Sequence, residues 1–127
     1  MIEVGKSLTR EIVVDDARAI SFMGPELRVY GTPSVLADIE FVCRDLLRSL
    51  LPEGQDSVGS QVVLDHIGAA PLGAKANISA AIASVDNRKV VFSATVTFNG
   101  REIARANHTR TIVVVADLKA RIAKLKP

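Results

Sequence analysis

Three residues of the sequence carry side chains suited to acid–base or nucleophilic chemistry: Thr32, Glu40 and His66. Histidine titrates near neutral pH, and carboxylates and imidazoles are common general acids and bases. A threonine hydroxyl both donates and accepts hydrogen bonds, so it can be aimed at a substrate carbonyl. Each residue also has a purely structural explanation. The predicted helix or strand on which each residue lies helps to choose between the chemical and the structural explanation.

Glu40 lies at the margin of the apolar stripe of a predicted helix, about 85° from its centre at 100° per residue. There its carboxylate either faces the concave side of a sheet or is a solvated border residue paired with Arg44 at i+4. His66 ends an apolar strand run in which Val62 and Leu64 share its parity. It is either a hydrogen-bonded core residue or a general base.

Thr32 and Gly59 are open to the same two interpretations. Thr32 precedes Pro33, and this pair is typical of a helix N-cap followed by proline at the first helical position. Its hydroxyl is alternatively directed at substrate. Gly59 interrupts a strand, either as a bulge or as a place where the backbone approaches a ligand. We expect Gly59 and Pro33 to contact substrate if the chemical interpretation holds.

Two further groups are interpreted as structural. Cys43 lies within the apolar stripe and is expected to be packing rather than a nucleophile. His108 and Arg110 share one face of the last predicted strand, and we expect a structural pair near the sheet edge. No zinc-ligand spacing, phosphate loop or dinucleotide fingerprint is present, so no metal or cofactor is expected.

The helix that carries Glu40 is predicted over 33–50, with Asp38 on its polar side and Pro52 and Gly54 beyond its end. Its stripe recurs at helical spacing: Val35, Leu36, Ile39, Val42, Cys43, Leu46, Leu47 and Leu50. A single stripe requires one apolar surface to cover it.

The remaining chain is mostly strand, with two short helical stretches. Strands are predicted over 7–14, 58–67, 75–85, 90–98 and 101–115, with Asn99-Gly100 as a hairpin turn. Asp15-Asp16 is a candidate helix cap before 17–23, which Gly24-Pro25 ends, and a C-terminal helix begins at Asp117. Long antiparallel strands must curl as they twist. We therefore predict an α+β fold in which a curled antiparallel sheet wraps around one long central helix.

The composition restricts the kinds of molecule that this protein is expected to bind. The 127 residues suit one domain spanning 1–127, and the net charge of +2 shows no basic stripe of the kind that binds nucleic acid. A single cysteine excludes an intrachain disulfide, and neither a signal peptide nor a bilayer-length apolar run is apparent. We expect a cytoplasmic protein that does not bind membranes. The unpaired sheet edge and an outward-facing Phe41 indicate a homodimer, although a covering loop would also explain Phe41.

Thr32, Glu40 eight residues later, Gly59 and His66 seven residues further together resemble the active-site set of the fluoroacetyl-CoA thioesterase family, a branch of the hot-dog-fold thioesterases. The similarity covers nearly the whole chain and includes a His-x-Arg element at His108. It implies a hot-dog fold and a Thr, Glu and His set that hydrolyses an acyl-CoA. The family's namesake has an aromatic-rich lid before the helix, whereas 24–30 here contains only Tyr30, which leaves the acyl group open.

Thr32 and Glu40 are about 12 Å apart along the helix axis, so they do not touch directly. The site is therefore elongated or drawn from two subunits, and we favour a site at a dimer interface. Whether two such dimers assemble into a tetramer is left open. The alternative functions are a non-catalytic acyl-CoA binding or sensing domain and, without a supporting signature loop, an enoyl-CoA hydratase.

Overall fold

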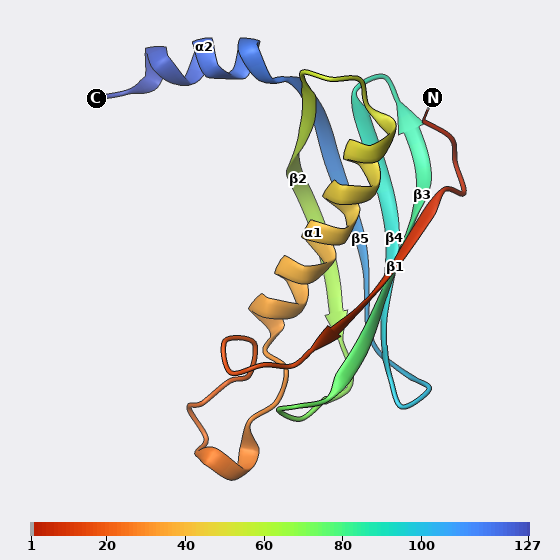
Figure 1. The fold of residues 1–127 in the computed structure, drawn as a ribbon, viewed down its shortest axis with the longest axis vertical. Coiled ribbons are helices and arrows are strands. Elements are labelled where there is room, and N and C mark those ends of the chain that lie inside the picture. The colour runs from red at the N-terminus through yellow and green to blue at the C-terminus, as the bar shows by residue number, and fades with distance from the viewer. Residues whose placement is uncertain (1) are drawn as a thin grey trace.

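The computed structural model describes residues 2–127 and contains a five-stranded antiparallel sheet, one long helix and a shorter C-terminal helix. The elements are β1 (Ser7–Val13), η1 (Pro25–Leu27), α1 (Thr32–Leu50), β2 (Gln55–His66), β3 (Lys75–Asp86), β4 (Lys89–Phe98), β5 (Arg101–Val114) and α2 (Val115–Leu125). The strand order is β1-β3-β4-β5-β2, and α1 lies across the curved sheet (Figure 1). The predicted α+β architecture is confirmed.

The core forms between the stripe of α1 and the inner face of the sheet, as predicted. Buried α1 residues include Val35, Ile39, Val42 and Leu47. The sheet contributes large side chains at alternate positions, and alanines at others let the helix approach: Ala76, Ile78, Ala80, Ile82, Val90, Phe92, Ala94 and Val96. This alternation is the period-2 pattern of strands with one buried face.

The last three strands form a meander, and β2 joins it from the far side. Asn99 and Gly100 have φ values of 52° and 72°, the paired positive angles of a tight hairpin turn, which confirms that turn. β2 pairs with β5 rather than with its successor β3. The outer side of β2 is therefore one open edge of the sheet.

Two local predictions before α1 are wrong. Residues 17–23 form turns and an isolated bridge rather than a helix, and Gly24-Pro25 begins the short η1 instead of ending one. Gly31 is the N-cap of α1, and the Thr32 side chain makes no capping hydrogen bond. Thr32 is the first helical residue because Pro33 is accommodated equally well at the second position of a helix, where its missing N–H has no partner to lose.

Asp38 was expected on the polar side of α1, and that expectation is also wrong. Asp38 is buried and accepts hydrogen bonds from Tyr30 (2.5 Å) and from Nε of Arg18 (2.8 Å). A buried carboxylate is tolerated when it is paired and hydrogen-bonded. The hydrogen bonds raise the pKa of Arg18, so the guanidinium stays charged. This group fixes the 15–31 segment against α1.

No helix among residues 2–127 combines the length and hydrophobicity required to cross a bilayer.

Candidate functional site

Thr32 and His66 meet at one end of the central helix. His66 is the last residue of β2, and Thr32 is the first residue of α1. Oγ1 of Thr32 lies 2.8 Å from Nδ1 of His66, within hydrogen-bonding distance. The other ring nitrogen, Nε2, is enclosed and has no hydrogen-bond partner among residues 2–127. Unsatisfied buried polar atoms are uncommon in native proteins, so Nε2 requires a partner from outside these residues.

The start of α1 adds donors beside Thr32. The first N–H groups of a helix have no acceptor within the helix and carry partial positive charge. Pro33 has no N–H, which leaves the amides of Thr32 and Ser34 at this end. A hydroxyl, an imidazole and free amides at one place are suited to binding a carbonyl oxygen that becomes negatively charged.

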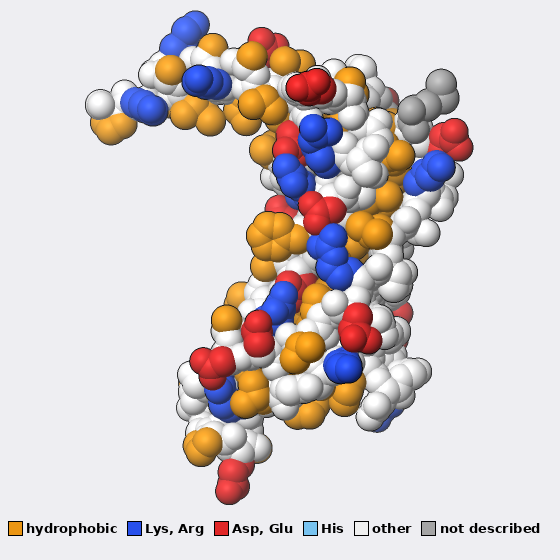
Figure 2. All heavy atoms as spheres, in the orientation of Figure 1, with side chains coloured by type: hydrophobic (Ala, Val, Ile, Leu, Met, Phe, Trp, Pro, Cys, Tyr) orange, Lys and Arg blue, Asp and Glu red, His pale blue; other side chains and the backbone are white. Residues whose placement is uncertain are grey.

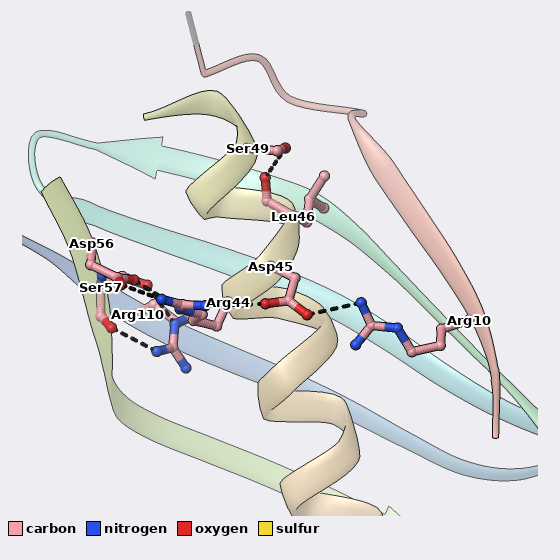
Figure 3. Close-up of polar contacts among 8 residues, drawn as sticks. All are labelled: Arg10, Arg44, Asp45, Leu46, Ser49, Asp56, Ser57 and Arg110. Atoms are coloured by element: carbon pink, nitrogen blue, oxygen red, sulfur yellow. Dashed lines mark hydrogen bonds and ion pairs between the residues drawn. The ribbon is translucent and has the colours of Figure 1, made fainter. Parts of the chain in front are cut away.

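Glu40 lies eight residues further along α1, against Gly59 in the first half of β2. Its Oε2 accepts a hydrogen bond from Arg110 at 3.4 Å, and its side chain remains about two-fifths exposed. The alternative pairing of Glu40 with Arg44 does not occur, because Arg44 pairs with Asp56 and Asp45. Figure 3 shows Arg44 extended towards Asp56 on β2. Glu40 is thus available at the surface of an open depression that Phe41 also lines.

Arg110 holds this second group together. It is only 5% exposed, and it donates from Nε to Oγ of Ser57 (2.7 Å) and from Nη2 to the Ser57 carbonyl (2.8 Å; Figure 3). A third contact joins Nη1 to Nε2 of His108 at 3.1 Å. Since a guanidinium only donates, Nε2 of His108 accepts, and Nδ1 donates to the Gln61 carbonyl at 2.9 Å. His108 and Arg110 are therefore a buried structural pair beneath Glu40 on β5, the strand next to the edge strand β2, as expected.

Burial sets the protonation of His108. Desolvation lowers its pKa, and the nearby Arg110 charge lowers it further, against opposing contributions from Gln61 and Glu40. The ring is consequently neutral at pH 7. Burial also lowers the pKa of Arg110, while Glu40 raises it. Arg110 is thus the donor, and Oε2 of Glu40 the acceptor, in the contact between these two side chains.

Gly59 makes room for the Glu40 carboxylate. A Cβ at this position would overlap Oε2 of Glu40 and lie 3.0 Å from Cε1 of His108. A β-bulge also lies here, since Gly59 pairs with Arg110 and Gln61 with Thr109, which leaves Ser60 as the extra residue. Both interpretations of Gly59 therefore hold: it adjoins a bulge, and a charged group approaches its backbone closely.

The bulge changes which residues of β2 face α1. Ser57 and Gly59 face it before the bulge, and Val62, Leu64 and His66 face it afterwards. Without the extra residue, Gly59 and His66 would lie on opposite faces, because they are seven residues apart.

Within one chain, the structure brings Thr32 to His66 but does not bring Glu40 to His66. Glu40 lies over Gly59, and His66 is seven residues further along the strand, roughly 20 Å at the usual rise. No contact joins the two groups within the described residues. We refer to them as the Thr32–His66 group and the Glu40–Arg110 group, the latter including Ser57, Gly59 and His108.

Sequence reasoning missed Ser57 and the supporting role of Arg110. The shared parity of His108 and Arg110 was visible, but the bulge that brings Ser57 to the same face was not. Cys43 is buried as expected, and burial raises the pKa of its thiol to about 12, which excludes it as a nucleophile at neutral pH.

Comparison with known proteins assigns the chain to a family. Residues 14–116 match the model of the fluoroacetyl-CoA-specific thioesterase family. This chain belongs to that family. By family it is a thioester hydrolase. The fluoroacetyl-CoA thioesterase of Streptantibioticus cattleyicolor is 22% identical over 99% of this chain and 96% of its own length.

Solved structures confirm the hot-dog fold. A structure of a fluoroacetyl-CoA thioesterase superimposes with a TM-score of 0.89 at 22% identity, over 100% of this chain and 99% of the other. A hot-dog-like protein from Thermanaerovibrio acidaminovorans and a thioesterase-superfamily member from Thermus thermophilus each reach 0.89, at 21% and 23% identity, over 98% of this chain and 93% of theirs.

The segment before α1 exposes little aromatic surface. Tyr30, the aromatic residue noted in the sequence, is 1% exposed and bonded to Asp38, so it is part of the core. Phe22, Met23 and Leu27 are exposed instead. The aromatic surface available in this segment is therefore a single phenyl ring.

Proposed function

We propose that this protein hydrolyses a small or medium acyl-CoA thioester to the free acid and CoA, with Thr32, Glu40 and His66 as the catalytic residues of a site shared between two subunits. The observation that carries the proposal is the 2.8 Å contact between Oγ1 of Thr32 and Nδ1 of His66. It is the contact expected between a nucleophile and its base.

The shared site follows from the open edge of β2. An exposed edge strand is a template for pairing with another chain. If two copies pair antiparallel through β2 about a two-fold axis at Val63, the bulge at Ser60 brings Gly59 opposite the partner's His66. Both residues then face the same side of the joined sheet, where side chains on opposed residues are neighbours. Glu40, which lies over Gly59, thereby meets the partner's imidazole.

This arrangement orders three groups as in a catalytic triad. Thr32 Oγ1 lies at Nδ1 of His66, and the partner's Glu40 becomes the acceptor for Nε2 once the dimer contact moves the side chains that enclose this atom in the single chain. The carboxylate holds the proton on Nε2, so Nδ1 is free to take the Thr32 proton. Attack of Oγ1 on the thioester carbonyl forms a C–O bond and an oxyanion, which the first amides of α1 stabilise. Breaking the C–S bond releases CoA, which takes the proton from His66. Water then attacks the acyl-threonine ester while His66 accepts its proton, and cleavage of the C–O bond to Thr32 releases the free acid as the His66 proton returns to Oγ1.

A second route uses the same residues. Water, rather than Thr32, attacks the carbonyl while His66 accepts its proton, and Thr32 orients the substrate. Only the first route forms a covalent acyl-threonine intermediate. Intact-mass measurement of the rapidly quenched enzyme tests this, because only the first route adds the mass of the acyl group to the chain, and Thr32→Ala removes it.

The acyl group is expected to be small or medium and not specifically fluorinated. Two of the relatives compared above are named for fluoroacetyl-CoA, but in this chain the segment before α1 exposes one phenyl ring, that of Phe22, and buries Tyr30. Gly59 and Pro33 border the site and are expected to contact substrate, Gly59 through its backbone.

The deciding experiment is a panel of short, branched, aromatic and fluorinated acyl-CoAs, assayed by thiol trapping with wild type and with Glu40→Gln. The proposal predicts rapid CoA release by wild type with at least one substrate and a large loss in the variant. Binding without thiol release would instead identify an acyl-CoA sensor, and loss of enoyl absorbance without thiol release would identify a hydratase.

A further inference from the structure

The C-terminal helix α2 carries an apolar stripe that the chain itself does not cover. Its eleven residues include no buried residue, and among the described elements its main contact is with β5. Val115, Leu118, Ile122 and Leu125 recur at spacings of three and four, the strict seam of a helix that packs along one narrow line. Isolated helices shorter than about 12–15 residues are marginal in water. A stable α2 therefore requires a surface against this stripe.

The position of α2 indicates where that surface lies. The N–H of Val115 bonds to the Gly54 carbonyl (2.9 Å), and Val114 pairs with Gln55, so α2 starts at the first residue of β2. From there it projects beyond the open edge of β2, away from the rest of the sheet (Figure 1). Hydrophobic side chains line the side of α2 that faces the hollow beneath it (Figure 2).

We propose that α2 packs its apolar stripe on a second copy of this chain, against the segment 67–72 of that copy, and so covers the end of the partner's catalytic site. The inference rests on the β2-to-β2 pairing of the proposed function. In that pairing Gly59 lies opposite the partner's His66, the last residue of β2, so Gln55 lies beyond the end of the partner's β2, on the side where segment 67–72 continues. The first turn of α2 therefore lies beside the partner's segment 67–72.

The partner surface has the matching chemistry. Ile67 and Leu72 are 56% and 44% exposed, and they flank the point that α2 reaches. Burying exposed aliphatic side chains from both copies is the dominant favourable contribution to such an interface. Segment 67–72 directly follows His66, whose ring contacts Thr32. A helix placed there shields the Thr32–His66 group of the partner from water, so each site would receive its cover as well as its Glu40 from the other subunit.

A lipid surface is the competing occupant, since Lys119, Arg121 and Lys124 give α2 basic flanks. Helices that lie in a membrane interface present a wide apolar face, often with aromatic residues. The stripe of α2 is narrow and contains no aromatic residue, which is the pattern of packing against protein. The geometry therefore favours a second copy.

The test compares two carboxylates placed on α2. Ile122→Glu inserts a charge in the stripe, and Ala120→Glu inserts the same charge on the opposite side of the helix, about 180° away. Dimer dissociation constants are measured by sedimentation equilibrium, and amide hydrogen exchange of 115–125 is followed at concentrations above and below dissociation. We expect Ile122→Glu to weaken the dimer at least about tenfold and to abolish exchange protection of α2, whereas Ala120→Glu changes neither by more than about twofold.

Each other outcome is informative. Rapid exchange of α2 in an intact, active wild-type dimer would overturn the inference and leave the proposed function standing. A monomeric wild type that is fully active would overturn both. Protection of α2 only in tetramers, or stripe-dependent sedimentation with phosphatidylserine vesicles, would overturn the inference by assigning α2 to another occupant.

Discussion

The Thr32–His66 group and the Glu40–Arg110 group both join α1 to β2, but they are built differently. The first consists of one hydrogen bond and an imidazole nitrogen with no partner among residues 2–127. In the second, a buried Arg110 reaches Ser57, His108 and Glu40, and the bonding atoms are nearly all satisfied within the chain.

This difference indicates that the two groups have different roles. A buried polar network in which every member is satisfied rigidifies its surroundings, so the Glu40–Arg110 group can hold a carboxylate in a fixed position. In the Thr32–His66 group, Nε2 of His66 has no hydrogen-bond partner among residues 2–127, and the proposed mechanism supplies one from the partner subunit. One chain thus places the Thr32–His66 group at the end of β2 and the Glu40 carboxylate over its first half, and the proposed mechanism requires both.

The largest expected effect follows from removing either reactive group. His66→Ala and Glu40→Gln should each lower kcat by about two to four orders of magnitude, the usual scale for general-base catalysis. Steady-state thiol release measures kcat, and thermal unfolding serves as the control for folding. Wild-type-like turnover by either variant would remove that residue from the mechanism.

The next largest effect concerns the support of Glu40. Arg110→Met leaves the Ser57 carbonyl and the His108 ring without their donor, and each buried acceptor left unsatisfied costs about 1–3 kcal/mol. We expect both a lower free energy of unfolding in urea and a lower kcat. Thr32→Ser, which preserves the hydroxyl of the other group, should leave stability unchanged. If Arg110→Met unfolds like wild type, the network is not what positions Glu40.

A smaller effect tests the close approach at Gly59. Gly59→Ala places a methyl group against Oε2 of Glu40, so the carboxylate must move. We expect a loss of about 1–3 kcal/mol in unfolding free energy, the usual cost of overpacking. In a Glu40→Ala background the same substitution should cost much less. Equal costs in the two backgrounds would show that the two residues do not interact.

The smallest effect is the pH dependence of stability due to His108. Burial lowers its folded pKa below the unfolded value, so the unfolded state binds more protons below about pH 6.5. This contribution to stability is fully present above pH 6.5 and is lost as the pH falls towards the folded pKa, at no more than about 1.4 kcal/mol per pH unit. Urea unfolding of wild type and His108→Gln between pH 5 and 7.5 measures it. A His108→Gln slope equal to that of wild type would contradict the assignment.

Most of the fold could be predicted because its signals are local and periodic. The stripe of α1, the alternation in β4 and the Asn99-Gly100 turn each specify their element without information from elsewhere. The pairing of β2 with β5, and not with β3, could not be read from any one segment, because it depends on how the whole sheet closes around the helix.

The site was less accessible to sequence reasoning for the same reason. Thr32 was interpreted partly as a helix cap, whereas the structure directs its hydroxyl to His66, 34 positions away. Asp38 was assigned to solvent because periodicity alone does not reveal a buried hydrogen-bonded carboxylate. The bulge at Ser60, which reverses the parity of β2, has no signature apart from Gly59.

The central claim is that Glu40 of one subunit and His66 of the other form one site. Mixing Glu40→Gln and His66→Ala proteins, each nearly inactive, tests it directly, since a mixed dimer then contains one site with both native residues. After unfolding and refolding together, the account predicts recovery of about a quarter of wild-type activity, the statistical share of intact sites in random two-fold dimers. No recovery above the two separate variants, with mixed dimers verified by native mass spectrometry, would contradict it.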